Sequence, residues 1–433
     1  MPTEKLGVLV LGSGGREHAL FQEFYKSPLV GGVLVAPGNG GIPQCLRCSI
    51  DIMDFAAVLE LARREGIGLI VPGPEALLCA GIVDYFAKHA PDIKVFGPNM
   101  AAAKVEGSKA FLKRICTAYD ISTPDYRVVH TIYDASNVLH NWGVPIVIKA
   151  DGLSSGKGVV VAKTESEAEE AIYKALTNNA FGHAGHTLVI ERFVPGREVS
   201  VMAFCDGKGR AVLMPPVRDY KKAYDGDEGP NTGGMGAVCP VPDVGTALLE
   251  RIRVEIIERL LDAMCFEGSP YQGVLYAGIM VTPEGEPKLL EGNVRFGDPE
   301  GQVLLSRLKS DLAEIMLACC EPGGLSKIEA PRWSDNATVG VVVVEEPYPQ
   351  AANGGASFEK INGIPAARAA AGNVFFGSAF KSSDGTYLSG GGRVVTIVGE
   401  GKDIAEARER AYAGASLIEC VGTRYRTDIA ENM

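Results

Sequence analysis

The chain has 433 residues, of which 46% are hydrophobic and 22% are charged, the composition of a globular protein with more than one hydrophobic core. Its formal net charge of −11 argues against non-specific nucleic-acid binding, although a locally basic cleft can still hold a small anion. No apolar run approaches the roughly 18 residues of a membrane span, and the first strand lacks a signal-peptide layout, so we expect a cytoplasmic protein that binds neither membrane nor nucleic acid.

The first hundred residues alternate between strands and helices. Apolar strands are expected at 7–11, 33–36 and 69–71, and Asp54 is a suitable N-cap for a helix that runs through Arg64. This alternation favours a doubly wound parallel sheet, in which ligands bind beyond the carboxyl ends of the strands. The turns found there contain Gly14 and Gly15, Gly38 and Asn39, and Pro74 and Glu75.

The first glycine turn does not fit a dinucleotide site. The GxGxxG fingerprint requires glycine at position 17, where this chain has Glu17, and a bulky carboxylate opposes a pyrophosphate. Backbone N–H groups of residues 13–16 at a helix start can still hold one phosphate monoester.

Beyond Ser108, a suitable N-cap for the next helix, the pattern changes to an α+β unit with hairpin-like strands. A helix is expected at 166–176, and strands are expected at 145–150, 158–161, 188–193 and 198–204. The last hundred residues add a strand at 339–344, a Gly-rich hairpin around Gly390 to Arg393, and a closing helix from about Asp403.

A glycine loop at 152–158 lies between the first two of these strands. It is not a Walker A loop, because three residues instead of four separate Gly152 from Gly156, and Gly158 replaces the magnesium-binding hydroxyl. The arrangement indicates a flap that covers a triphosphate, with Lys149 on the preceding strand; a solvated hairpin is the alternative. The strand at 188–193 offers backbone groups to an adenine edge, and Glu198 could accept from ribose hydroxyls.

The most informative segment follows the apolar pair Leu289 and Leu290. Glu291, Asn293 and Arg295 occupy alternate positions, so on a strand they would all face the same side. Hard oxygen ligands beside a fixed cation suit a Mg²⁺-bound polyphosphate. The alternative is an edge strand that presents a polar face to water.

Taken in order, these features resemble the ATP-grasp superfamily, and within it the chain is similar to the phosphoribosylamine–glycine ligase family over essentially its whole length. The most specific runs are DGDEGPNTGGMG at 225–236 and NVRFGDPE at 293–300. The resemblance implies an N-terminal doubly wound domain at 1–104, an α+β ATP-grasp domain at 105–328 with a mobile lid at about 124–194, and a small α+β domain at 329–433.

The resemblance also implies a reaction, in which ATP, glycine and 5-phosphoribosylamine give glycinamide ribonucleotide, ADP and phosphate in de novo purine (IMP) biosynthesis. It implies Mg²⁺ or Mn²⁺ as the metal and small molecules as substrates, and partners that channel substrates in purine synthesis stay open. A carboxylate is a poor acyl donor, so glycine is expected to take the γ-phosphoryl group first, as glycyl phosphate. Such chemistry depends on alignment and charge neutralisation more than on a Ser-His-Asp set.

Site residues are carried over from the matching motifs. Lys109 and Lys149 would hold the phosphates, and Glu291 and Asn293 would ligate the metal. Arg295 would stabilise the transferred phosphoryl group, and Asp219 would meet the glycine ammonium. The flap residues are Gly152, Ser154, Ser155, Gly156, Lys157 and Gly158, and the adenosine residues are Glu191, Phe193, Val194 and Glu198. The phosphoribosylamine residues are Gly14, Gly15, Gly38, Asn39, Pro74 and Glu75, with Asp298 and Pro299 as further substrate contacts.

Two other functions stay open. One is an ATP-grasp ligase with a different acceptor, and the other is a catalytically inactive nucleotide-binding protein. The chain also departs from the family pattern at Arg218, Tyr220, Gly301 and Phe376, and Arg218 adds a positive charge beside Asp219.

Overall fold

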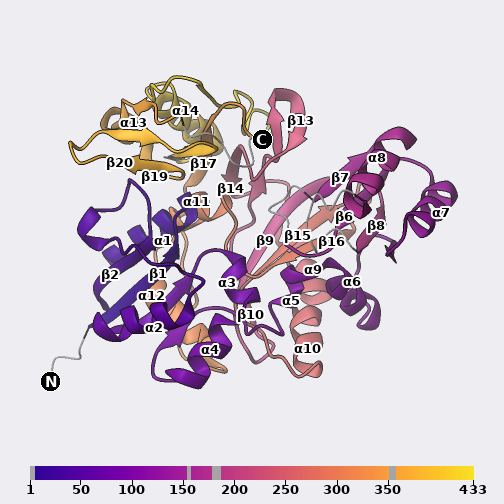
Figure 1. The fold of residues 1–433 in the computed structure, drawn as a ribbon, viewed down its shortest axis with the longest axis horizontal. Coiled ribbons are helices and arrows are strands. Elements are labelled where there is room, and N and C mark those ends of the chain that lie inside the picture. Colours follow the sequence, from indigo (N-terminus) through magenta and orange to yellow (C-terminus); the bar gives the residue numbers. More distant parts are fainter. Residues whose placement is uncertain (1–4, 154–157, 178–186, 351–356) are drawn as a thin grey trace.

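A computed structural model describes residues 5–153, 158–177, 187–350 and 357–433, and all structural statements below concern these ranges. The chain forms three α/β units, which lie side by side in Figure 1 as the indigo, magenta-to-orange and yellow parts of the ribbon. The expected three-domain α/β architecture is therefore confirmed. Within these ranges, every helix is too short or too polar to cross a membrane.

The N-terminal unit is a parallel sheet in the order β2-β1-β3-β4. Its strands are β1 (Leu6–Gly12), β2 (Val30–Pro37), β3 (Ile67–Pro72) and β4 (Lys94–Val95). Its helices are α1 (Gly15–Lys26), α2 (Phe55–Arg64), α3 (Glu75–Cys79) and α4 (Ile82–His89). Alternate residues of β1 are buried in two different hydrophobic clusters, so both faces of the sheet are covered, as a parallel sheet requires. Asp54 caps α2 as expected, accepting from the N–H groups of Ala56 and Ala57.

The central unit contains two four-stranded antiparallel sheets. One has the order β10-β9-β15-β16, with β9 (Arg197–Asp206), β10 (Ala211–Leu213), β15 (Gln272–Val281) and β16 (Pro287–Asn293). The other has the order β5-β8-β6-β7, with β5 (Tyr126–Val129), β6 (Ile146–Ala150), β7 (Val159–Ala162) and β8 (Leu188–Arg192). The helices are α5 (Lys104–Gly107), α6 (Lys109–Ala118), α7 (Ile132–Trp142), α8 (Glu165–Leu176), α9 (Thr246–Ile252) and α10 (Arg259–Phe266). A π-helical segment, Arg253–Glu258, joins α9 to α10.

The hairpin-like strands expected in this unit include β6 and β7, which pair antiparallel, whereas β8 and β9 follow each other in the chain without pairing. β8 pairs with β5 and β6, whereas β9 pairs with β10 and β15. Gly196 explains the difference, because its φ of +156° lets the chain cross from one sheet to the other. A Cβ atom at Gly196 would also lie 2.3 Å from the carbonyl oxygen of Val281.

The C-terminal unit is built on a six-stranded antiparallel sheet, to which the central segment contributes two strands. Its members are β11 (Arg218–Asp219), β14 (Gly236–Cys239), β17 (Ala337–Glu345), β19 (Gly372–Phe376), β22 (Arg393–Gly401) and β23 (Thr423–Arg424). A small sheet contains β18 (Lys360–Ile361), β20 (Ala379–Lys381) and β21 (Tyr387–Ser389), and the helices are α13 (Ile364–Ala371) and α14 (Ile404–Ala415). The ribbon β12 (Lys222–Tyr224) and β13 (Glu228–Asn231) and the helices α11 (Glu300–Leu305) and α12 (Leu312–Cys319) complete the fold.

The expected hairpin around Gly390 to Arg393 is wrong. These residues connect β21 of the small sheet to β22 of the large sheet, and β21 pairs with β18 and β20 instead. The turn therefore passes between two sheets, which places Arg393 at the boundary between the domains, where it donates to the carbonyl oxygen of Gly233.

Candidate functional site

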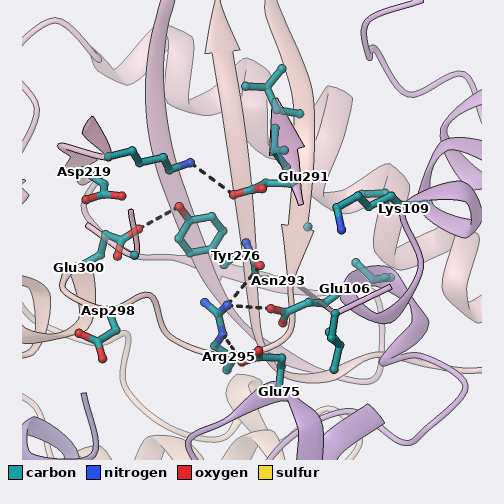
Figure 2. Close-up of a pocket in the computed structure, with 18 of the residues that line it drawn as sticks. Glu75, Glu106, Lys109, Asp219, Tyr276, Glu291, Asn293, Arg295, Asp298 and Glu300 are labelled. Atoms are coloured by element: carbon teal, nitrogen blue, oxygen red, sulfur yellow. Dashed lines mark hydrogen bonds and ion pairs between the residues drawn. The ribbon is translucent and has the colours of Figure 1, made fainter. Parts of the chain in front are cut away.

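Three cavities contain most of the expected site residues. The central cavity, about 320 Å³, is lined by charged residues that include Lys109, Asp219, Glu291 and Arg295 (Figure 2). The inter-sheet cavity, about 650 Å³, lies between the two sheets of the central unit and is lined by β6, β7 and β8 on one side. The glycine cavity, about 290 Å³, is lined by turns of the N-terminal and C-terminal units.

The end of β16 supplies one wall of the central cavity. Glu291 and Asn293 both line it, as their alternation on a strand predicts. The strand ends at Asn293, so Arg295 lies in the following loop and not on the strand as expected. Arg295 still lines the same cavity, where its Nη2 donates to Asn293 Oδ1 at 3.4 Å.

Cations surround the Glu291 carboxylate. Its Oε1 lies 3.4 Å from Lys221 Nζ. Lys221 lowers the pKa of Glu291 most; burial opposes this, but Lys149, Lys109 and Arg295 add to the lowering, and the pKa falls to about 2. Glu291 is therefore an ionised oxygen donor at neutral pH.

Glu291 and Asn293 fit a divalent metal that is shared with a polyphosphate. A carboxylate and an amide oxygen are hard donors, and Mg²⁺ bound with phosphates commonly takes only one or two protein ligands. Across the described ranges there is no cluster of three or more His, Cys, Asp or Glu residues that could hold a metal without such help.

Arg295 is held by two carboxylates that converge on it in Figure 2. Glu106 Oε1 lies 2.7 Å from Nη2, and Glu75 Oε2 lies 3.3 Å from Nε. Glu75 was expected at a phosphoribosylamine turn but faces the central cavity instead, and Glu106 had no expected role. The sequence did not indicate Glu106, because its partner lies almost 200 positions away. Its only signal was its place in the run EGSKAF at 106–111, which also resembles the ligase family.

Two acidic residues lie at the far side of the central cavity. Glu300 Oε1 accepts from the Tyr276 hydroxyl at 2.9 Å, whereas the buried Oδ1 of Asp219 has no hydrogen-bond partner among the described residues. Burial, followed by the nearby Glu300, raises the pKa of Asp219 well above its usual value. An unpartnered carboxylate of this kind is suited to a ligand cation.

Arg218, which departs from the family pattern and adds a positive charge beside Asp219, is paired with Asp243 at 2.9 Å. This ion pair neutralises the added charge.

The inter-sheet cavity brings together four residues expected to bind adenosine: Glu191, Phe193, Val194 and Glu198. Glu191 is 1% exposed and forms ion pairs with Lys149 at 2.8 Å and with Lys113 at 3.1 Å. Its carboxylate is thus a buried counter-ion to two lysines. Lys113, on α6, was not expected, because nothing in the local sequence indicates its contact with β8.

The flap is described at both ends. Lys109 Nζ donates to the carbonyl oxygen of Gly152 at 2.8 Å, and Ala150 N–H donates to the carbonyl oxygen of Gly158 at 2.8 Å. Ser108 caps α6 as expected, accepting from Phe111 N–H. The other flap residues, Ser154, Ser155, Gly156 and Lys157, lie outside the described ranges.

Two of the three expected phosphoribosylamine turns meet at the glycine cavity, which Gly14, Gly15, Gly38 and Asn39 all line. The Asn39 amide is occupied by protein groups: Nδ2 donates to the carbonyl oxygens of Ser13 at 2.9 Å and Phe376 at 2.6 Å, and Oδ1 accepts from Gly41 N–H. The side chain therefore joins the N-terminal turns to β19. Pro74 lies in the third turn, beside Glu75, and precedes α3.

Arg393 and Asp298 separate the glycine cavity from the central cavity. Both residues line both cavities, and Arg393 Nη2 lies 3.3 Å from Asp298 Oδ2. Pro299 follows as the N-cap of α11. Arg393 was expected only as part of a turn, with no functional role. The local sequence does not indicate its partners, because they come from a different domain.

Comparison with known proteins gives a consistent result. The family models of phosphoribosylglycinamide synthetase match as an N domain at 6–106, an ATP-grasp (A) domain at 107–301 and a C domain at 338–432. The phosphoribosylamine–glycine ligase of Salmonella typhimurium is 43% identical over 425 residues, covering 98% of this chain and 97% of that protein. The corresponding protein of Escherichia coli K12 is 44% identical over 411 residues, covering 94% of each.

Solved structures agree. The phosphoribosylamine–glycine ligase of Thermotoga maritima has a TM-score of 0.81 and 32% identity, covering 98% of this chain and 100% of that one. Biotin carboxylase of Campylobacter jejuni has a TM-score of 0.71 at 15% identity over 99% of each chain, which shows a shared fold only.

Proposed function

We propose a residue-level account of catalysis for this chain, which belongs to the phosphoribosylglycinamide synthetase family and is an ATP-dependent ligase. It joins glycine to 5-phosphoribosylamine, giving glycinamide ribonucleotide, ADP and phosphate in purine biosynthesis. The main support is that the central cavity and the glycine cavity are adjacent. The Arg393–Asp298 ion pair lines both of them.

ATP lies with its base in the inter-sheet cavity and its phosphates toward the central cavity. The apolar lining of Val147, Val161 and Met280 covers the adenine, and Glu198 accepts from the ribose. Lys149 forms an ion pair with Glu191 and donates one N–H to the carbonyl oxygen of Leu290, and an ammonium group has three N–H donors, so one remains for a phosphate oxygen.

Glu291 and Asn293, which line the central cavity, would hold the divalent metal, Mg²⁺ or Mn²⁺. When bound, such an ion neutralises charge on the phosphate oxygens. Lys109, which gives one N–H to Gly152, has donors left for the same phosphates.

Glycine lies between the phosphates and the acidic pair. The unpartnered Asp219 Oδ1 accepts from the ammonium group of glycine. The carboxylate of glycine is thereby directed toward Arg295. A carboxylate oxygen attacks the γ-phosphorus and the bond to the ADP oxygen breaks, giving glycyl phosphate. Arg295 offsets the charge on the transferred group.

The amine of phosphoribosylamine completes the reaction. Its 5-phosphate lies in the glycine cavity, on first-turn N–H groups of α1 from Gly15 onward and on Arg393. The amine attacks the glycyl carbonyl, and the tetrahedral intermediate expels inorganic phosphate and loses a proton to solvent. Asn39 positions the Gly14 turn without using its side chain on the substrate.

The test is ADP release from purified protein with MgATP, glycine and freshly prepared phosphoribosylamine, together with glycine labelled with ¹⁸O in its carboxylate. We expect ADP release that requires both co-substrates and transfer of one ¹⁸O atom to inorganic phosphate. Release with a different amine would contradict the acceptor assignment, and phosphate without ¹⁸O would contradict the glycyl phosphate step.

Arg393→Ala tests the position of the acceptor. Because Arg393 faces the glycine cavity, we expect the KM for phosphoribosylamine to rise roughly 10- to 100-fold, the range for losing a charge-assisted hydrogen bond, while the KM for ATP is unchanged. A larger effect on ATP than on the amine would contradict this placement.

A further inference from the structure

Glu106 contacts both the side chain and the backbone of the segment that carries Arg295. One carboxylate oxygen, Oε1, accepts from Arg295 Nη2 at 2.7 Å, and the other, Oε2, accepts from the N–H of Val294 at 2.7 Å. Since both oxygens are engaged with one short segment, the carboxylate fixes the guanidinium relative to its own main chain.

The short helix α5, on which Glu106 lies, is itself fixed against β16. A Cβ atom at Gly292 would lie only 2.6 Å from Val105 Cγ1, so helix and strand are in direct contact. The side chain of Glu106 is 8% exposed, and its pair with Arg295 is therefore not a solvent-screened surface ion pair.

The remaining hydrogen bonds of Arg295 leave little freedom. Nε donates to Glu75 and Nη2 donates to Glu106 and Asn293, while Nη1 makes a long contact of 3.4 Å with the carbonyl oxygen of Phe296. A guanidinium has five N–H groups, so one N–H on Nη1 has no partner among the described residues. The partners of Nε and Nη2 fix the guanidinium plane, and with it the direction of this remaining N–H.

We propose that Glu106 is a positioning residue for Arg295, holding the guanidinium so that its remaining N–H points at the phosphoryl group during transfer. This inference rests on the proposed function, in which Arg295 meets that group. Both carboxylate oxygens of Glu106 are occupied by the Val294–Arg295 segment, so it acts through Arg295.

The charge state of Glu106 gives the proposal a second readout. Burial raises the pKa of Glu106 to about 7; Arg295 opposes the rise and Glu75 adds to it. The charged and titratable groups that face Glu106 are Arg16 on α1, Glu75 and Cys79 on α3, Lys109 on α6, Tyr271 before β15, and Arg295. As pH falls through about 7 the carboxyl is progressively protonated and the ion pair to Arg295 is progressively lost, so kcat should fall on the acid side.

The first experiment compares Glu106→Gln with wild-type protein. Gln keeps the size of the side chain but removes its charge, and we expect kcat to fall roughly 10- to 100-fold, with KM for ATP within about twofold, because positioning acts on the transition state. The acid limb of kcat near pH 7 should disappear in this variant. Glu267→Gln is the matched control, since Glu267 pairs with Arg114 at the surface, and it should behave as wild type.

The second experiment is a double-mutant cycle with Arg295→Lys. If Glu106 acts through Arg295, Glu106→Gln should have almost no further effect on kcat in the Arg295→Lys background. Additive losses, or a folded Glu106→Gln variant with wild-type kcat and acid limb, would overturn the proposal. If Glu106→Gln does not fold, Glu106→Asp replaces it, with a reduced kcat and a retained acid limb expected, and wild-type kcat overturning the proposal.

Failure of the proposed function can be distinguished from failure of the inference about Glu106. Wild-type protein that releases no ADP with glycine and phosphoribosylamine contradicts the proposed function, and this inference with it. An active wild-type protein whose Glu106 variants are indistinguishable from it contradicts the inference alone.

Discussion

The central cavity and the glycine cavity are adjacent but built from different chemical groups. Charged side chains line the first, including Lys109, Lys221 and Glu291. Backbone turns from two domains line the second, where Asp298 and Arg393 are the charged residues. A transferring phosphoryl group requires charges placed individually, whereas a phosphate monoester is satisfied by a row of N–H groups.

This difference predicts opposite sensitivities to mutation. Removal of a side chain should damage the central cavity, because each charge there has a separate task. Addition of a side chain should damage the glycine cavity, because a Cβ occupies the space through which backbone approaches the ligand.

The strongest test of the comparison is Glu291→Ala. The change removes a metal ligand where phosphoryl charge develops, so we expect kcat to fall roughly 100- to 1,000-fold while the fold is retained. ADP release and a thermal melt measure the two quantities. Glu284→Ala, an exposed change just before β16, is the control and should leave kcat unchanged. Near-wild-type turnover of Glu291→Ala would contradict the assignment of Glu291 as a metal ligand.

An intermediate effect is expected for Gly14→Ala. Its backbone φ of −82° suits any residue, but the new Cβ would lie 2.8 Å from Glu17 Oε2 and 3.1 Å from Asp298 Oδ2. Overpacking of this kind costs about 1–3 kcal/mol, so the KM for phosphoribosylamine should rise roughly 10- to 100-fold with the KM for ATP unchanged. Gly32→Ala is the control, since a Cβ there meets nothing within 4 Å. Equal effects on both substrates would mean that the two cavities are not functionally distinct.

The two cavities also differ in how far the sequence reveals them. Glu291 and Asn293 were predictable, because strand alternation places both on one face. Arg295 was expected on the same strand but lies beyond its end, and its partner Glu106 comes from a distant helix. Local pattern carries no information on such long-range pairs.

The glycine cavity was only half predictable. The turns at Gly14 and Gly38 were expected because parallel strands end together, and they do meet. The opposite wall, with Arg393, comes from a turn that was wrongly expected to close a hairpin. Asn39 was expected to bind substrate, yet its amide hydrogen-bonds to Phe376 of the C-terminal unit. That contact depends on how two domains dock, which no local motif specifies.

The smallest expected effect concerns that docking. His18 on α1 is 2% exposed, and its Nδ1 accepts from the N–H of Phe376 at 2.9 Å. Burial, with a smaller contribution from Arg368, lowers the pKa of His18 to about 3. Because the pKa in the folded state lies below the value of 6.5 for an unfolded chain, the unfolded state binds the extra proton first as pH falls. The contribution of the neutral His18 to the free energy of unfolding is fully present above about pH 6.5 and is lost progressively toward pH 3.

Between pH 7 and pH 5 this titration should lower the free energy of unfolding by about 2 kcal/mol. His18→Gln keeps an acceptor for the Phe376 N–H but cannot titrate, so urea unfolding of this variant should lack that part of the pH dependence. His140→Gln, exposed on α7, should retain the wild-type dependence. If His18→Gln and wild type lose stability equally at pH 5, then the neutral imidazole is not what joins the N-terminal and C-terminal walls of the glycine cavity. The contact between Asn39 and Phe376 would then be the main candidate for that role, and Asn39→Ala should raise the KM for phosphoribosylamine more than His18→Gln does.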